Sequence, residues 1–195
     1  MSRVKGDVIR SVQSRIPGLT KGLPPRRDIF GEEVAAPSGR FALIDPFNVT
    51  RNVQDPVIDE AKKIGVSISV PSGIVDGIKM TPAEFSEYQR VRGRLTKVLL
   101  QKLMGSPDYQ KLGTVEKRKA FESAMRQVGE EVNGQIFPAL MIVRYGLPRD
   151  TNPALLREVL NAVGKNRKFK GMDIEAQAEV IKKLMAVVVE KLKLQ

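Results

Sequence analysis

Apolar side chains recur at helical spacing through most of the chain after residue 76. They follow one another every three or four positions from Phe85 to Leu103, and again in stretches that begin near Thr114 and at Pro153. Residues at this spacing share one face of a helix. We therefore predict a mainly α fold with about five helices.

Start and stop signals agree with this spacing. Residues Thr81 to Glu84 combine a capping hydroxyl, a proline at the first helical position and the glutamate of a capping box. A cap residue followed by proline recurs at Asp55-Pro56, Ser106-Pro107 and Asn152-Pro153. Each of these sites predicts the start of a helix.

The first 75 residues have a different pattern. Prolines recur throughout, and proline fixes φ and favours extended backbone around it. Large apolar residues are interspersed, which is not typical of a disordered tail. We predict an extended strap with short helices over residues 1–75, buried on the rest of the chain or on another subunit, before a helical domain over residues 76–195. Within the strap, residues 66–70 alternate apolar side chains with serine, which predicts one short edge strand.

The last helix is predicted from about Asp173 and is broadly apolar. Two series of apolar residues repeat every seven positions: Ile174, Ile181 and Val188, and Ala178, Met185 and Leu192. This spacing fits a coiled-coil seam over three heptads, and it also fits ordinary core packing, which we favour. Because so apolar a helix needs cover, we expect part of this face to be buried between subunits.

The composition limits the kinds of catalytic and metal-binding site that the chain can contain. The 195 residues include no His, Cys or Trp, which excludes disulfides, thiolate metal sites, cysteine nucleophiles and imidazole acid–base catalysis. No glycine-rich phosphate loop occurs, and adjacent acidic pairs such as Glu130-Glu131 are typical of a solvated surface. We expect no cofactor, no metal site and no enzymatic activity. An enzyme that relies on carboxylates and lysines is the least favoured alternative.

The net charge of +11 suggests a polyanionic neighbour, although the basic residues are spread along the chain, as is common for solubility alone. The densest basic run is a candidate nucleic-acid contact with one aromatic ring for stacking, and is otherwise a solvated loop between two helices. Its residues are Lys165, Arg167, Lys168, Phe169 and Lys170. No apolar run approaches the ~18 residues of a membrane-spanning helix, so no transmembrane span is expected.

A longer pattern resembles one family. Residues 15–31 read RIPGLTKGLPPRRDIFG, followed by the element TPAEF at Thr81 and the element SPDY at Ser106. This order is similar to a region of the large polyvalent, internal virion structural proteins of tailed bacteriophages. The resemblance covers roughly residues 15–130 and implies a virion protein, made in the host cytoplasm, of a short-tailed phage. It brings no catalytic motif onto any position of this chain.

These observations favour a non-enzymatic structural component of a phage particle, associated with its interior or with DNA ejection. We expect a homo-oligomer or a complex with other virion proteins. The alternative is a basic nucleic-acid-binding protein that contacts packaged DNA, which differs by losing affinity steeply as salt rises. The predicted partner interface comprises Leu19, Leu23, Ile29, Phe30, Phe41, Phe47, Ile181, Met185, Val188 and Leu192.

Overall fold

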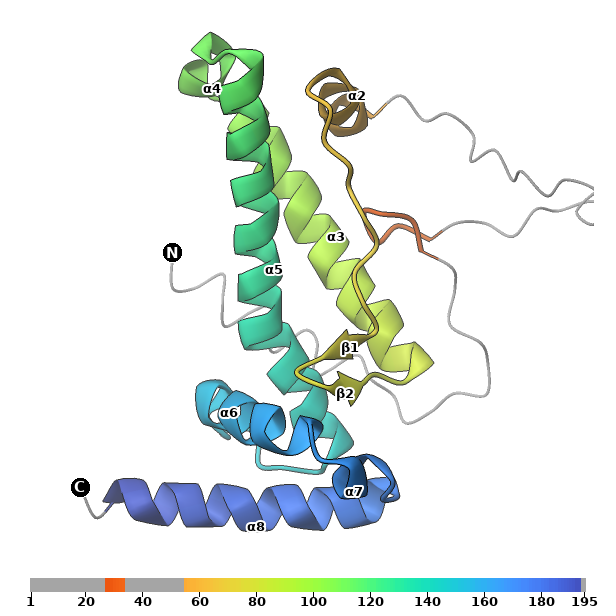
Figure 1. Ribbon diagram of the computed structural model, residues 1–195, viewed down its shortest axis with the longest axis vertical. Coiled ribbons are helices and arrows are strands. Elements are labelled where there is room, and N and C mark those ends of the chain that lie inside the picture. Colours follow the sequence, from red (N-terminus) through yellow and green to blue (C-terminus); the bar gives the residue numbers. More distant parts are fainter. Residues whose placement is uncertain (1–26, 34–54, 194–195) are drawn as a thin grey trace, which may run out of the picture. The chain divides into compact units, whose positions relative to one another are not determined.

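The computed structural model describes residues 27–33 and 55–193, and the chain is mainly α, as predicted (Figure 1). Most of the predicted strap, including Leu19, Leu23, Phe41 and Phe47, lies outside the described residues. The helices are α2 (Pro56–Lys63), α3 (Pro82–Met104), α4 (Pro107–Lys111), α5 (Thr114–Arg144), α6 (Pro153–Gly164), α7 (Arg167–Lys170) and α8 (Ile174–Lys193). The strands are β1 (Ile74–Val75) and β2 (Ile78–Lys79).

The helix starts confirm the capping signals of the sequence. At α3 the Thr81 backbone N–H donates to Glu84 Oε2 at 2.8 Å, and the Glu84 N–H donates to the Thr81 hydroxyl at 3.3 Å, which is the reciprocal capping box. The side chains of Asp55, Ser106 and Asn152 accept from first-turn N–H groups of α2, α4 and α6. Local side-chain chemistry therefore sets where these helices begin.

The chain forms two compact units, and α3 and α5 each contribute residues to both. Among the described residues, unit 1 contains 72–88 and 130–193, and unit 2 contains 27–33, 55–71 and 89–129. No helix of the described residues combines the length and hydropathy that crossing a bilayer requires.

Unit 2 is organised around one hydrophobic core. Helices α2, α3 and α5, the C-cap residue of α2 and the 27–33 segment supply its buried residues, which are Phe30, Val57, Ala61, Ile64, Leu100 and Phe121. The strand predicted over residues 66–70 is wrong, because this segment pairs with no described strand. Its alternation instead reflects extended backbone: Val66 and Ile68 pack against the core, while Ser67 and Ser69 are exposed.

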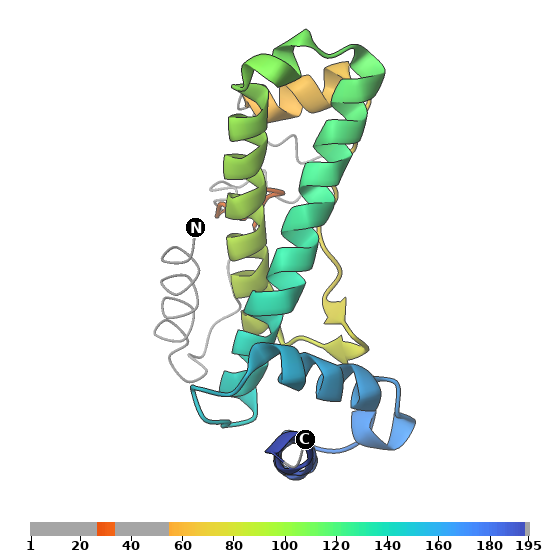
Figure 2. The same ribbon diagram turned by 90° about the vertical axis from the view of Figure 1, so that its left-hand side faces the viewer.

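Unit 1 contains the antiparallel β1–β2 hairpin and helices α6, α7 and α8. Figure 2 views α8 nearly end-on below α6, and these two helices pack against each other. Asp76 and Gly77, at the hairpin tip, have positive φ angles of 50° and 80°. A Cβ on Gly77 would lie 2.7 Å from the carbonyl carbon of Gly164, so this tip approaches the end of α6 backbone to backbone.

Candidate functional site

Residues 27–33 form a turn that is held by its own aspartate. The Asp28 Oδ1 atom accepts the backbone N–H groups of Phe30 at 2.9 Å and Glu32 at 2.8 Å. Gly31 has a φ of 74°, and a Cβ there would lie 2.6 Å from the Arg90 Cα atom of α3. Both the left-handed conformation and the close approach require glycine. Asp28 and Gly31 at the end of the 15–31 motif therefore have a local structural role in this turn.

Helix α3 has a glycine at the position where this turn lies against it. An added Cβ at Gly93 of α3 would overlap the Phe30 carbonyl group and the Gly31 amide nitrogen. The turn therefore lies directly on the helix backbone, and the Phe30 ring is only 3% exposed. Phe30, predicted as a partner contact, is covered by the core of its own unit. Ile29 is partly buried beside it.

Lys97 joins this turn to the start of α2. Its Nζ atom lies 2.9 Å from Glu32 Oε1 and 3.0 Å from Asp55 Oδ2, and 5.2 Å from the centre of the Phe30 ring. The hydrogen bonds to Glu32 and then Asp55 raise the pKa of Lys97 above its ordinary value, although partial burial opposes this. One charged side chain thus stabilises two segments that are distant in sequence.

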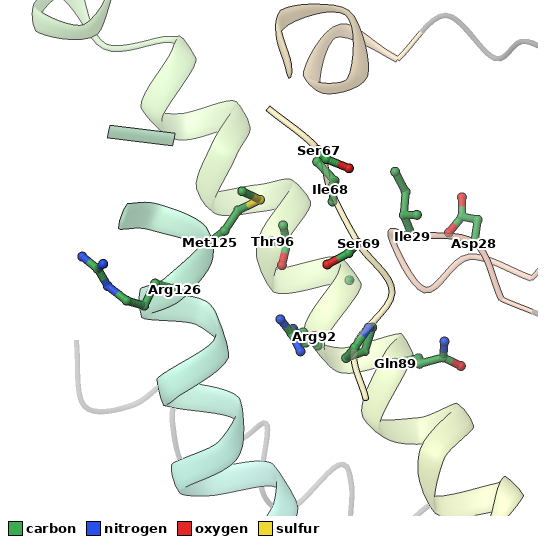
Figure 3. A pocket seen from close by; sticks show the side chains of 12 residues that line it. Asp28, Ile29, Ser67, Ile68, Ser69, Gln89, Arg92, Thr96, Met125 and Arg126 are labelled. Atoms are coloured by element: carbon green, nitrogen blue, oxygen red, sulfur yellow. The ribbon is translucent and has the colours of Figure 1, made fainter. Parts of the chain in front are cut away.

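A pocket of about 170 Å³ lies beside the turn, wholly within unit 2 (Figure 3). Its walls come from the 27–33 turn, the extended 67–71 segment, α3 and α5. Ile29, Ile68 and Met125 supply apolar surface. The polar side chains that line it are Asp28, Ser67, Ser69, Gln89, Arg92, Thr96 and Arg126.

Hydrogen-bond donors outnumber acidic groups in this pocket. Arg92 is half-buried and Arg126 is exposed, and neither forms an ion pair with another described residue. Among the described residues of the lining, Asp28 is the single carboxylate, and its Oδ1 atom already accepts two backbone N–H groups. Figure 3 shows Ser69, Arg92 and Thr96 among the side chains that line this pocket. The arrangement suits a small anion.

The basic run is only partly as predicted. Lys165, Arg167, Lys168 and Lys170 are exposed, but residues 167–170 form the short helix α7 rather than an open loop. Phe169 faces inward and is 3% exposed, so its ring is not free to stack on a base as the sequence suggested. Asn166 caps the first N–H groups of α7, and in this short helix the Phe169 ring is buried while the four basic side chains around it are exposed.

The inner face of α8 is covered by unit 1 itself. Ile181 and Met185, predicted as partner contacts, are buried there, and Val188 is half-buried. The side chain of Leu192 lies outside the described part. This placement matches the favoured core-packing interpretation. The exposed apolar residues lie on the flanks of that face and include Leu184 at 37%, Val187 at 48% and Val189 at 39% exposure.

The sequence analysis did not identify the pocket. Its polar residues come from four separated stretches, and their relation depends on how the turn and the extended segment lie on α3 and α5. The one available signal was the pair Arg92 and Thr96, which are four apart and so share a helix face.

No protein-family model, curated protein or solved structure matches this chain. Within residues 27–33 and 55–193, no group of three or more acidic side chains is placed to hold a metal ion. The function therefore has to be inferred from the surfaces described above.

Proposed function

We propose that this chain is a non-enzymatic structural component of a tailed bacteriophage particle, and that it assembles through α8. The observation that carries the assembly proposal is the exposed apolar flank of this helix. The virion assignment rests on the resemblance of residues 15–130 to internal virion proteins.

The exposed flank is a stripe at helical spacing. Val180, Leu184 and Val187 are separated by four and three positions, so they lie along one side of α8. Val180 is half-buried, and Leu184 and Val187 are exposed. Covering such a stripe stabilises an association in proportion to the apolar area removed from water.

The charges of α8 favour a second copy of the same helix as the partner. The acidic residues Asp173, Glu175 and Glu179 lie at or near its start, whereas the remainder of the helix has an excess of basic residues, namely Lys182, Lys183, Lys191 and Lys193 against the single acidic Glu190. An antiparallel copy would place the acidic start of each helix against the basic end of the other. This is the self-complementary arrangement of a two-fold dimer.

The test is the mass of the protein in solution. Wild-type chain is expected to reach twice the 21.6 kDa of one chain as its concentration rises, with Leu184→Asp and Val187→Asp remaining monomeric. Ala186→Asp is the matched control, since Ala186 is exposed and points away from the stripe by helical geometry. Circular dichroism confirms that each variant keeps its helices. A wild-type chain that stays monomeric, or a Leu184→Asp variant that still dimerises, contradicts the assembly proposal.

The virion assignment has its own test. Mass spectrometry of purified particles from the source of the sequence is expected to detect the chain as a stoichiometric component. Its absence from complete particles contradicts the assignment without affecting the dimer.

The second candidate function is binding to packaged DNA, favoured by the four exposed cations around α7. Replacing Lys165, Arg167, Lys168 and Lys170 with Gln is expected to weaken DNA binding and flatten its salt dependence. The control variant loses the same charge elsewhere, because Gln replaces the exposed Lys62, Lys63, Lys102 and Lys119. If the control weakens DNA binding as much as the first variant does, the basic run has no specific role.

A further inference from the structure

We propose that the pocket of unit 2 binds a phosphate group, with Arg92 as its principal ligand. This site is separate from the α8 stripe and does not depend on the proposed assembly.

The charge and hydrogen-bonding character of the pocket point to an oxyanion. A phosphate presents several acceptor oxygens and negative charge, so it needs N–H and O–H donors and a cation. Arg92 supplies a planar fork of donors, and Thr96 and Ser69 supply hydroxyls in the lining of the same pocket (Figure 3). Arg126 adds a second positive charge at the exposed side of α5.

Within the described part of the chain, the side chains of Arg92 and Thr96 are available to a ligand. Thr96 is 7% exposed, yet its hydroxyl forms no hydrogen bond with any described residue. Arg92 forms no ion pair within the described part of the chain, although it is half-buried. Among the described residues, neither side chain has a polar atom that is both fully buried and unpaired, so the donors of both reach the open space of the pocket, where a ligand can pair with them. A bound anion would satisfy both side chains at once.

The size of the pocket restricts the ligand to a small group. Its volume of about 170 Å³ is below the range of roughly 300–1,000 Å³ that holds drug-sized molecules. The space therefore suits the phosphate group itself. That group is either free phosphate or one phosphodiester of a nucleic-acid backbone, and the two share the chemistry that the pocket recognises.

The test measures binding of inorganic phosphate to the full chain by titration calorimetry at constant ionic strength. Wild-type protein is expected to bind, and Arg92→Gln is expected to weaken binding at least about tenfold, since hydrogen bonds to charged groups are the strong ones. Arg94→Gln is the matched control. It removes the same charge two positions further along α3, on the other side of the helix, where Arg94 is exposed and does not line the pocket.

Thr96→Val keeps the proposal falsifiable if Arg92→Gln fails to fold. It preserves the shape of the side chain and removes only the hydroxyl, so weaker phosphate binding with an unchanged melting temperature supports the site. Absence of phosphate binding by the wild type overturns the proposal. Equal losses in Arg92→Gln and Arg94→Gln also overturn it, because they indicate attraction by diffuse charge alone.

A second arm distinguishes the two sources of the phosphate group. The same variants are titrated with a short DNA duplex in place of inorganic phosphate. Parallel weakening of phosphate and DNA binding by Arg92→Gln supports a backbone phosphodiester as the ligand. Weakening of phosphate binding alone supports free phosphate. Either result requires that Arg94→Gln retain wild-type affinity for the same probe.

Discussion

The contact between the 27–33 turn and α3 predicts an effect of Gly93→Ala on stability that is opposite to the effect of helix propensity. Gly93 lies inside a helix, where alanine is ordinarily the more stable residue by about 1 kcal/mol. The Cβ of that alanine would overlap backbone atoms of Phe30 and Gly31. Because no side chain there can rotate away, the turn has to move off the helix. We therefore expect Gly93→Ala to destabilise unit 2.

The size of the effect follows from what the turn contributes. Phe30 is 3% exposed, and burying a phenylalanine stabilises a fold by about 1.5–3 kcal/mol. The ion pair of Lys97 with the largely exposed Glu32 adds at most about 1 kcal/mol. After the gain in helix propensity is subtracted, the free energy of unfolding should fall by roughly 1–3 kcal/mol.

Urea unfolding followed by circular dichroism measures this change. Gly129→Ala in α5 is the matched control, since its Cβ would meet only Arg92 Nη2, at an ordinary 3.7 Å, and it should be as stable as wild type or more so. In the Gly93→Ala background, Phe30→Ala should lower the free energy of unfolding little further, because both changes remove the same contact. A Gly93→Ala variant that is more stable than wild type would refute the close approach described here.

Three further predictions concern single side chains. Lys97→Met should lower the free energy of unfolding by about 1–2 kcal/mol in the same urea assay, because Asp55 is buried and loses its cation. Burial, and then the hydrogen bond to Glu60, raises the pKa of Tyr109 from 10.0 to about 12. The stability that the protonated Tyr109 contributes should therefore be retained below pH 10 and lost between pH 10 and 12. In Tyr109→Phe this part of the alkaline fall in melting temperature should disappear. Ile181→Asp should abolish much of the helical circular dichroism signal, because this side chain is fully buried, whereas Leu184→Asp should retain it.

Helix boundaries were predictable because their causes are local. The capping residues Thr81 and Asn152 act on N–H groups two or three positions away, so a short window of sequence contains the whole interaction. The orientation of Phe169 was not predictable in the same way. In a helix as short as α7, one ring is buried or exposed according to the neighbouring helices.

Gly93 and the pocket illustrate what sequence reasoning misses. Within α3 a glycine indicates only weaker helix propensity, and its role appears once the 27–33 turn lies against it. The failed strand at residues 66–70 has a related cause. Alternation of apolar and polar residues predicts an extended backbone, but pairing requires a second strand, which no periodicity within one segment can supply.

The division of the chain into units has a consequence for its synthesis. All described residues of unit 2 precede Glu130, so they are synthesised before α6, α7 and α8. The β1–β2 hairpin is translated before α3, yet its tip contacts Gly164 of α6, so this contact forms only after that helix has been made. Long-range contacts of this kind form slowly. A nascent chain arrested within α6 should therefore already protect the backbone amides around Phe30 from hydrogen exchange while those of the hairpin still exchange freely.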